Sequence, residues 1–186
     1  MDPVTFDAKA ESLGVNKAKK NWNSVGDHAP AYLINLYLAT GDDNYARFLE
    51  DTFDTICDHF PDYGYSPFMN EKFFDDWSHD LKWGIHQARC VVGHNLKVAW
   101  NLTRMHSLMP KESYKTFAHQ IADAIPGAGC DTQRGGWYDM MERTLKDGEE
   151  NYRRVWHDRK AWWQQEQGKK PFENDWISFI STLFLL

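Results

Sequence analysis

The chain has 186 residues, a length at which a single domain buries a substantial hydrophobic core. Its residues are 42% hydrophobic and 26% charged, as in water-soluble globular proteins. The net charge of −6 argues against a nucleic-acid partner, because binding to phosphates requires a basic face. Aromatic residues reach 15% of the chain, with nine Trp. Flat rings suit the C–H faces of sugars, although for any single ring a place in the core is the simpler interpretation.

Cysteine usage and the two ends of the chain indicate a cytoplasmic protein. Cys57, Cys90 and Cys130 form no CxxC pair, which favours free thiols in a reducing compartment. No signal peptide opens the chain, and the apolar run 177–186 is about half of the ~20 residues that span a bilayer. We therefore expect no membrane partner. We also expect no cofactor and no metal, since no standard zinc arrangement matches the spacing of His79, His86, His157 and Asp158.

The first half of the chain predicts a buried helix, an outer helix and a hairpin. Residues 1–21 are polar and patternless and are expected to form a loose lead-in. Residues 28–39 are apolar on nearly all sides, which predicts a buried helix. A second helix, over about 42–60, carries its apolar residues on one stripe and is expected to lie outside. Short aromatic runs within 62–74 predict a β-hairpin.

The same order then recurs. A second buried helix is predicted from near residue 90 to about 109, where Pro110 ends it, and an amphipathic partner over 112–125. Aromatic segments at 135–139 and 151–155 flank a turn at Asp147-Gly148, which predicts a second hairpin. A third inner helix carries Lys160 to Trp163.

The regular spacing of these elements predicts a repeat architecture. His28, His94 and Trp162 open the three inner helices at intervals of about 66 and 68 residues. Pairs of one inner and one outer helix close into an α/α toroid. Hairpins at one end then wall a central pocket, which the first residues of the inner helices line. The fold class predicted is therefore all-α, an (α/α) toroid with short β-hairpins at one end.

Three motifs resemble the N-acylglucosamine 2-epimerase and cellobiose 2-epimerase family. The segment Gly93-His94 to Leu102 resembles the GHxxE-type inner helix of that family. Lys160-x-Trp162-Trp163-x-Gln165 is similar to its K-x-W-W-x-Q segment on the next inner helix, and Gly135-Gly136-Trp137-Tyr138 to the strand before it. His28 falls where the family often has another pocket histidine. The resemblance covers about residues 22–168, and the tail 169–186 is atypical.

The resemblance implies an (α/α)6 barrel that isomerises a reducing sugar at C2. After ring opening, a base removes the C2 proton, and a second acid/base returns a proton to the opposite face or to C1. Histidine suits both steps, since its pKa of ~6.5 lies near working pH. By analogy His94 is an acid/base and His28 aids ring opening or binds substrate. The resemblance also implies a set of substrate-binding residues: Trp162, Trp163, Trp137, Lys97, Gln167 and Glu166. Because Trp162 and Trp163 are adjacent in the sequence, we expect one of them to stack on the sugar and the other to lie in the core.

The departures from the family pattern concern the carboxylates and the length. Lys97 stands where the family has an acidic residue three positions after the histidine, and Gln167 aligns with a family Glu, beside Glu166. Family barrels are roughly twice as long, and their second catalytic histidine and a substrate-binding Arg lie in repeats that this chain lacks. We expect an incomplete barrel, for which a truncated or frame-shifted reading frame is one hypothesis. Its uncovered inner helices suggest pairing into a homodimer.

Two other functions stay open. A glycoside hydrolase on a similar toroid needs two opposed carboxylates, for which Asp76, Asp80 and Asp139 are candidates without a paired motif. A non-catalytic sugar-binding or truncated inactive module is consistent with Lys97, Gln167 and the missing repeats.

Overall fold

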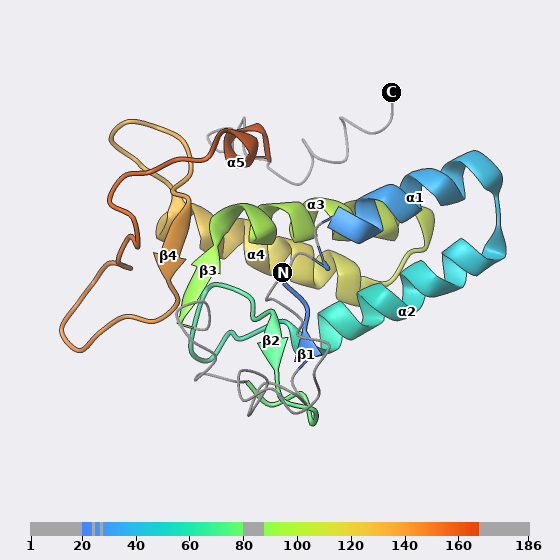
Figure 1. The fold of residues 1–186 in the computed structure, drawn as a ribbon, viewed down its shortest axis with the longest axis horizontal. Helices are drawn as coiled ribbons and strands as arrows, with labels where there is room; N and C mark the ends of the chain where they lie inside the picture. The colour runs from blue at the N-terminus through green and yellow to red at the C-terminus, as the bar shows by residue number, and fades with distance from the viewer. Residues whose placement is uncertain (1–19, 24, 27, 80–87, 168–186) are drawn as a thin grey trace, which may run out of the picture.

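Two antiparallel helix pairs form the body of the protein, and a short fifth helix lies over the second pair (Figure 1). The computed structural model describes residues 20–23, 25, 26, 28–79 and 88–167. The first pair is α1 (His28–Thr40) and α2 (Asp43–His59), and the second is α3 (Val92–Leu108) and α4 (Glu112–Gly129). The fifth helix is α5 (Trp162–Gln167), which packs on α3.

The helix boundaries follow local chemistry. Gly41 adopts φ 67°, and its N–H bonds to the Tyr37 carbonyl at 2.8 Å, which ends α1 in the left-handed manner that glycine permits. Asp42 then caps α2 by accepting a hydrogen bond from the Asn44 N–H at 2.8 Å. The predicted bounds of α2 and α3 are confirmed to within about two residues. Helix α4 begins as predicted and runs four residues past the predicted end, with Pro126 inside it.

The core lies between α2, α3 and α4. Helix α2 buries one stripe that includes Leu49, Phe53 and Ile56, so its prediction as an amphipathic helix is confirmed. Helix α3 is the most buried of the described helices, since ten of its 17 residues are buried. Each large apolar side chain buried here contributes roughly 1.5–3 kcal/mol.

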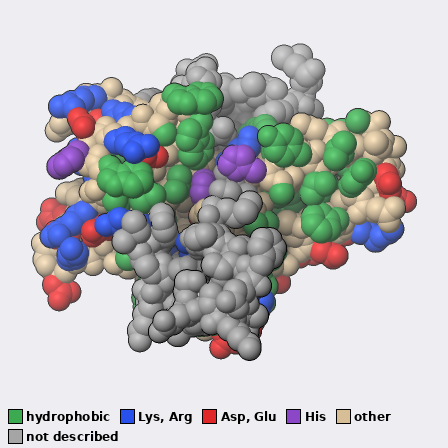
Figure 2. Space-filling view, in the orientation of Figure 1, with side chains coloured by type: hydrophobic (Ala, Val, Ile, Leu, Met, Phe, Trp, Pro, Cys, Tyr) green, Lys and Arg blue, Asp and Glu red, His purple; other side chains and the backbone are tan. Residues whose placement is uncertain are grey.

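Helix α1 is mostly exposed, so the prediction that it is buried is wrong. Only Pro30 and Ile34 are buried, while Tyr32, Leu36 and Leu38 are 68%, 44% and 58% exposed. Figure 2 shows these hydrophobic side chains as part of an apolar surface over α1. The apolar sequence needs neighbours on both sides for burial, and the described part of the chain supplies α2 and a limited contact with α3. The expected tail 169–186 and residues 1–19 of the lead-in lie outside the described residues.

The short strands pair differently from the predicted hairpins. Strand β2 (Lys72–Phe73) pairs antiparallel with β1 (Lys20–Asn21), not with another part of 62–74, so the first hairpin prediction is wrong. Strand β4 (Met140–Glu142) pairs antiparallel with β3 (Arg89–Val91), which leads directly into α3. The second hairpin forms in part, through a bridge between Met141 and Arg154. Among the described residues no helix combines the length and the apolar character that crossing a bilayer requires.

Candidate functional site

The first turn of α3 is buried beneath α5. Gly93, His94 and Asn95 are all buried there. A Cβ at Gly93 would lie 2.5 Å from Gln164 Cγ and 2.5 Å from Trp163 Cζ3, so only glycine allows α5 to approach this closely. The Gly93 N–H donates to Gln164 Oε1 at 2.8 Å. The glycine before the histidine is therefore needed for the contact between the two inner helices.

His94 is paired with a carboxylate that the sequence analysis missed. Its Nδ1 lies 3.1 Å and 3.0 Å from the two carboxylate oxygens of Glu71. The two side chains are only 8% and 13% exposed. When Nδ1–H donates to the carboxylate, the neutral imidazole carries its lone pair on Nε2, which is the form a general base requires. Glu71 can thus orient the imidazole of His94 from a segment outside α3.

The loop that carries Glu71 is fastened to α3 by a neighbouring amide. The Met69 N–H donates to Asn95 Oδ1 at 2.9 Å, and Asn95 Nδ2 donates to the Val91 carbonyl at 3.1 Å. The Trp22 N–H donates to the Glu71 carbonyl at 2.8 Å. These bonds fix the backbone on both sides of the Glu71 side chain, so the position of its carboxylate relative to His94 is set by backbone hydrogen bonds.

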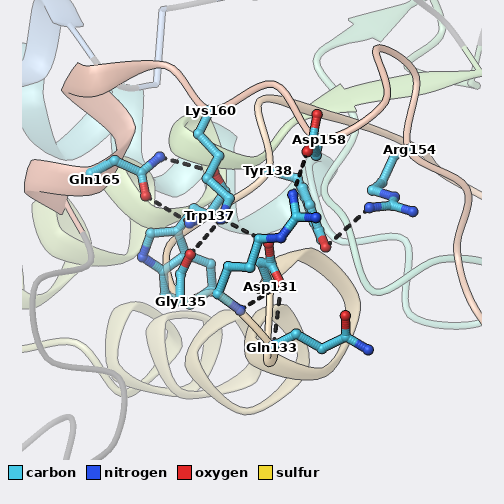
Figure 3. Close-up of polar contacts among 10 residues, drawn as sticks. Asp131, Gln133, Gly135, Trp137, Tyr138, Arg154, Asp158, Lys160 and Gln165 are labelled. Atoms are coloured by element: carbon cyan, nitrogen blue, oxygen red, sulfur yellow. Dashed lines mark hydrogen bonds and ion pairs between the residues drawn. The ribbon is translucent and has the colours of Figure 1, made fainter.

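Helix α5 is anchored by Gln164 and Gln165. Gln164 is fully buried, and its Nε2 donates to both the carbonyl and the carboxylate of Asp139. Gln165 accepts from the Trp137 N–H at 2.7 Å and donates to the Trp137 carbonyl at 2.8 Å (Figure 3). The aromatic ring of Trp163 is held beside that of His94, with 6.0 Å between ring centroids.

A groove of about 680 Å³ runs between α1, α3 and α5. It brings together four predicted site residues: His28 and Lys97, together with both tryptophans of α5, Trp162 and Trp163. The predicted difference between these two rings is found in part: Trp162 is 79% exposed, whereas Trp163 is half-buried and packs on Gly93 beside His94. Lys97 lies over the Trp100 ring, 3.7 Å from Nζ to the centroid. The groove is lined in addition by Ala31, Tyr32, Asn35, Trp100 and Arg104, which the sequence analysis did not select.

Other predicted residues lie elsewhere. Trp137 is 1% exposed and belongs to the core, so its prediction as a substrate-binding ring is corrected. Its buried place follows from the turn before β4, where both of its backbone groups bond to α5. The side chains of Glu166 and Gln167 lie outside the described residues. His94 is not among the groove-lining side chains, but its ring lies 6.0 Å, between centroids, from that of Trp163, which lines the groove.

Lys160 of the K-x-W-W-x-Q segment has a structural role (Figure 3). Its ammonium donates to Asp131 Oδ2 at 2.7 Å and to the Gly135 carbonyl at 2.6 Å. Lys160, together with the backbone N–H groups of Arg134 and Gln133, lowers the pKa of Asp131 to about 2. The lysine thereby fastens the 131–135 turn to the start of α5.

Of the carboxylates considered for a glycoside hydrolase, the two that the structure describes, Asp76 and Asp139, do not line the groove. Asp76 is exposed and accepts hydrogen bonds from Ser78, while Asp139 is bonded to Gln164 and to Arg159 at 2.9 Å. Asp80 lies outside the described residues. In the part of the chain that the structure describes, no three His, Cys, Asp or Glu side chains gather as metal ligands would.

Comparisons with known proteins support the fold. No protein-family model matches the sequence. No curated protein matches it either. Among solved structures, the cellobiose 2-epimerase of Spirochaeta thermophila is similar, with a TM-score of 0.54 and 15% sequence identity over 69% of this chain and 31% of that one. The chain thus spans about a third of the length of that enzyme. The likeness confirms the predicted fold class, an incomplete all-α toroid.

Proposed function

We propose that this chain is part of a sugar 2-epimerase-type toroid and binds a reducing sugar in the groove between α1, α3 and α5. The observation that carries the proposal is the His94–Glu71 pair, buried at the head of an inner helix beside a groove-lining tryptophan. A sugar epimerase is also what the similar structure is named. Trp162 and Trp163 present flat faces to a sugar ring, which suits its C–H surface.

The proposed chemistry needs no net oxidation. His94 Nε2 takes the C2 proton of the open-chain sugar, and the electron pair of the C2–H bond forms the C1–C2 double bond. The carbonyl electrons move to O1, which gives an enediolate. The positive charges of Lys97 and Arg104 in the groove favour this anion. Return of a proton to C2 on the opposite face gives the epimer, and return of a proton to C1 gives the ketose.

The remaining proposed roles follow from position in the groove. His28 stands at the first residue of α1, where it binds the sugar or assists ring opening. Glu71 acts through His94: its carboxylate accepts a hydrogen bond from Nδ1–H, so that the lone pair of the neutral imidazole is on Nε2, the atom that takes the proton.

Solvent exchange tests the proposal directly. The purified chain is incubated in deuterated water with reducing mono- and disaccharides, and deuterium at C2 is followed by NMR. We expect exchange that His94→Gln lowers by at least about 100-fold, since general base catalysis supplies about 10²–10⁴. His106→Gln is the matched control, because His106 lies at the other end of α3 and bonds to the Lys111 carbonyl. Exchange unaffected by His94→Gln would refute the assignment.

A non-catalytic sugar-binding module is the second candidate. The observation that favours it is the limited length, since the chain spans 31% of the similar enzyme. Binding of a sugar that quenches tryptophan fluorescence, with no C2 exchange for any sugar, would establish this alternative in place of the first.

A further inference from the structure

A single arginine holds the segment that leads to Glu71. Arg143 follows β4 and is 3% exposed. Its Nη2 donates to Asp62 Oδ2 at 2.6 Å and to the Phe68 carbonyl at 2.9 Å. Its backbone N–H donates to the Ala88 carbonyl at 2.9 Å, next to the strand that opens α3. One side chain therefore ties both ends of segment 62–68 to the strand pair at the head of α3.

The bonds of Asp62 extend this connection to the neighbour of Glu71. Asn70 Nδ2 donates to Asp62 Oδ2 at 3.2 Å, and His79 Nδ1 lies 3.2 Å from Asp62 Oδ1. The Asp62 and Arg143 side chains are 6% and 4% exposed. A buried ion pair of this kind adds little stability over apolar packing, because removing two charges from water is costly. A role in fixing the position of the loop accounts for the pair better than a role in stability.

Arg143 and Glu71 also share one small cavity. Both line a space of about 20 Å³, together with Lys72, Arg89 and Cys90. Burial raises the pKa of the Cys90 thiol, while the positive charge of Arg143 acts to lower it and the negative charge of Glu71 acts to raise it. Both charges therefore act on the same buried thiol.

We propose that Arg143 is a positioning residue for the His94–Glu71 pair. By binding Asp62 and the Phe68 carbonyl, it holds segment 62–71 so that both oxygens of Glu71 face Nδ1 of His94. Both bonds come from Nη2, at the far end of the side chain, and the shorter side chain of lysine does not carry its ammonium to that position. The inference rests on the proposed function, in which Glu71 acts through His94.

A double-mutant cycle tests the coupling. Arg143→Lys keeps a positive charge near Asp62, but its shorter side chain ends before the Nη2 position that serves Asp62 and the Phe68 carbonyl. We expect the rate of C2 exchange to fall on the order of tenfold with KM unchanged, since small displacements of a catalytic group have effects of this size or larger. In the Glu71→Gln background the same change is expected to cause no further loss. Arg153→Lys, an exposed arginine of the same hairpin paired with Glu149, is the matched control and is expected to leave the rate unchanged.

The tautomer of His94 gives a second readout that needs no sugar. ¹⁵N NMR of the imidazole is expected to show Nδ1 protonated in the wild-type chain and a mixture of tautomers in Arg143→Lys, with unchanged circular dichroism. Losses that multiply in the double variant, or a rate and tautomer that Arg143→Lys leaves unaltered, would overturn the inference. If the wild-type chain exchanges no sugar, the proposed function fails, and the tautomer comparison still decides the role of Arg143.

Discussion

Replacement of Gln164 by leucine removes the polar contact between α5 and the head of α3. The side chain is fully buried and makes three hydrogen bonds, one from the Gly93 N–H and two to Asp139. Leucine keeps a similar volume but leaves the Gly93 N–H and the Asp139 carbonyl without this partner. Each buried polar group left in that state costs about 1–3 kcal/mol, so we expect the docking of α5 to weaken by about 2–4 kcal/mol.

The size of this effect is read most directly at the Gly93 amide. A loss of about 3 kcal/mol changes the ratio of docked to undocked α5 by roughly 100-fold, at 1.4 kcal/mol for each factor of ten. Hydrogen exchange of the Gly93 amide, followed by NMR, should accelerate by a comparable factor, while amides in the centre of α3 keep their protection. Gln120→Leu, on the exposed side of α4, is the control. An unchanged exchange rate at Gly93 in a folded Gln164→Leu chain would refute the view that Gln164 holds α5.

Three further predictions concern the surface and the turn beside α5. The Lys160 ammonium lowers the pKa of Asp131 to about 2, below the ordinary value of 3.8. The ionised pair therefore stabilises the fold above about pH 4, and this contribution is lost as pH falls toward 2. Acid unfolding of Asp131→Asn should lack that component, and an acid transition unchanged from the wild type would contradict the pairing. Trp162→Ala should change the free energy of unfolding by no more than about 0.5 kcal/mol, since the ring is 79% exposed. The same variant should bind sugar more weakly in a fluorescence titration, and binding equal to that of the wild type would show that Trp162 is not part of the sugar site. Pairing with a second copy through the exposed side of α1 predicts that Leu36→Lys, or Tyr32→Lys, lowers the molar mass measured by light scattering; a wild-type chain that is monomeric at all concentrations would exclude that pairing.

Local patterns in the sequence were sufficient for most of the helical frame. The apolar stripe of α2, the proline after α3 and the cap at Asp42 act within a few residues of one another, so their consequences can be worked out without the fold. The repeat spacing selected His28, His94 and Trp162 as the first residues of inner helices, and two of them, His28 and Trp162, line one groove.

Contacts between distant segments were beyond such patterns. Glu71 lies in a loop 23 residues before His94, and nothing in its neighbourhood marks it as the partner of that imidazole. The aromatic run that contains Glu71 was the one available signal, and it predicted a hairpin whose strand in fact pairs with residues 20–21. Strand pairing depends on which backbone edge is nearby, so the alternation within 62–74 could not reveal its partner.

The sequence by itself therefore determined the bounds of α2 and α3 and the start of α4, because periodicity, caps and helix-ending residues act locally. The tertiary structure decided which side chains are covered and which charges meet. Apolar α1 is exposed because burial depends on neighbouring elements, and Trp137 is buried because its turn packs beneath α5. The carboxylate that orients His94 comes from a loop, because any segment that the fold brings within hydrogen-bonding distance can supply a partner to a side chain on a helix.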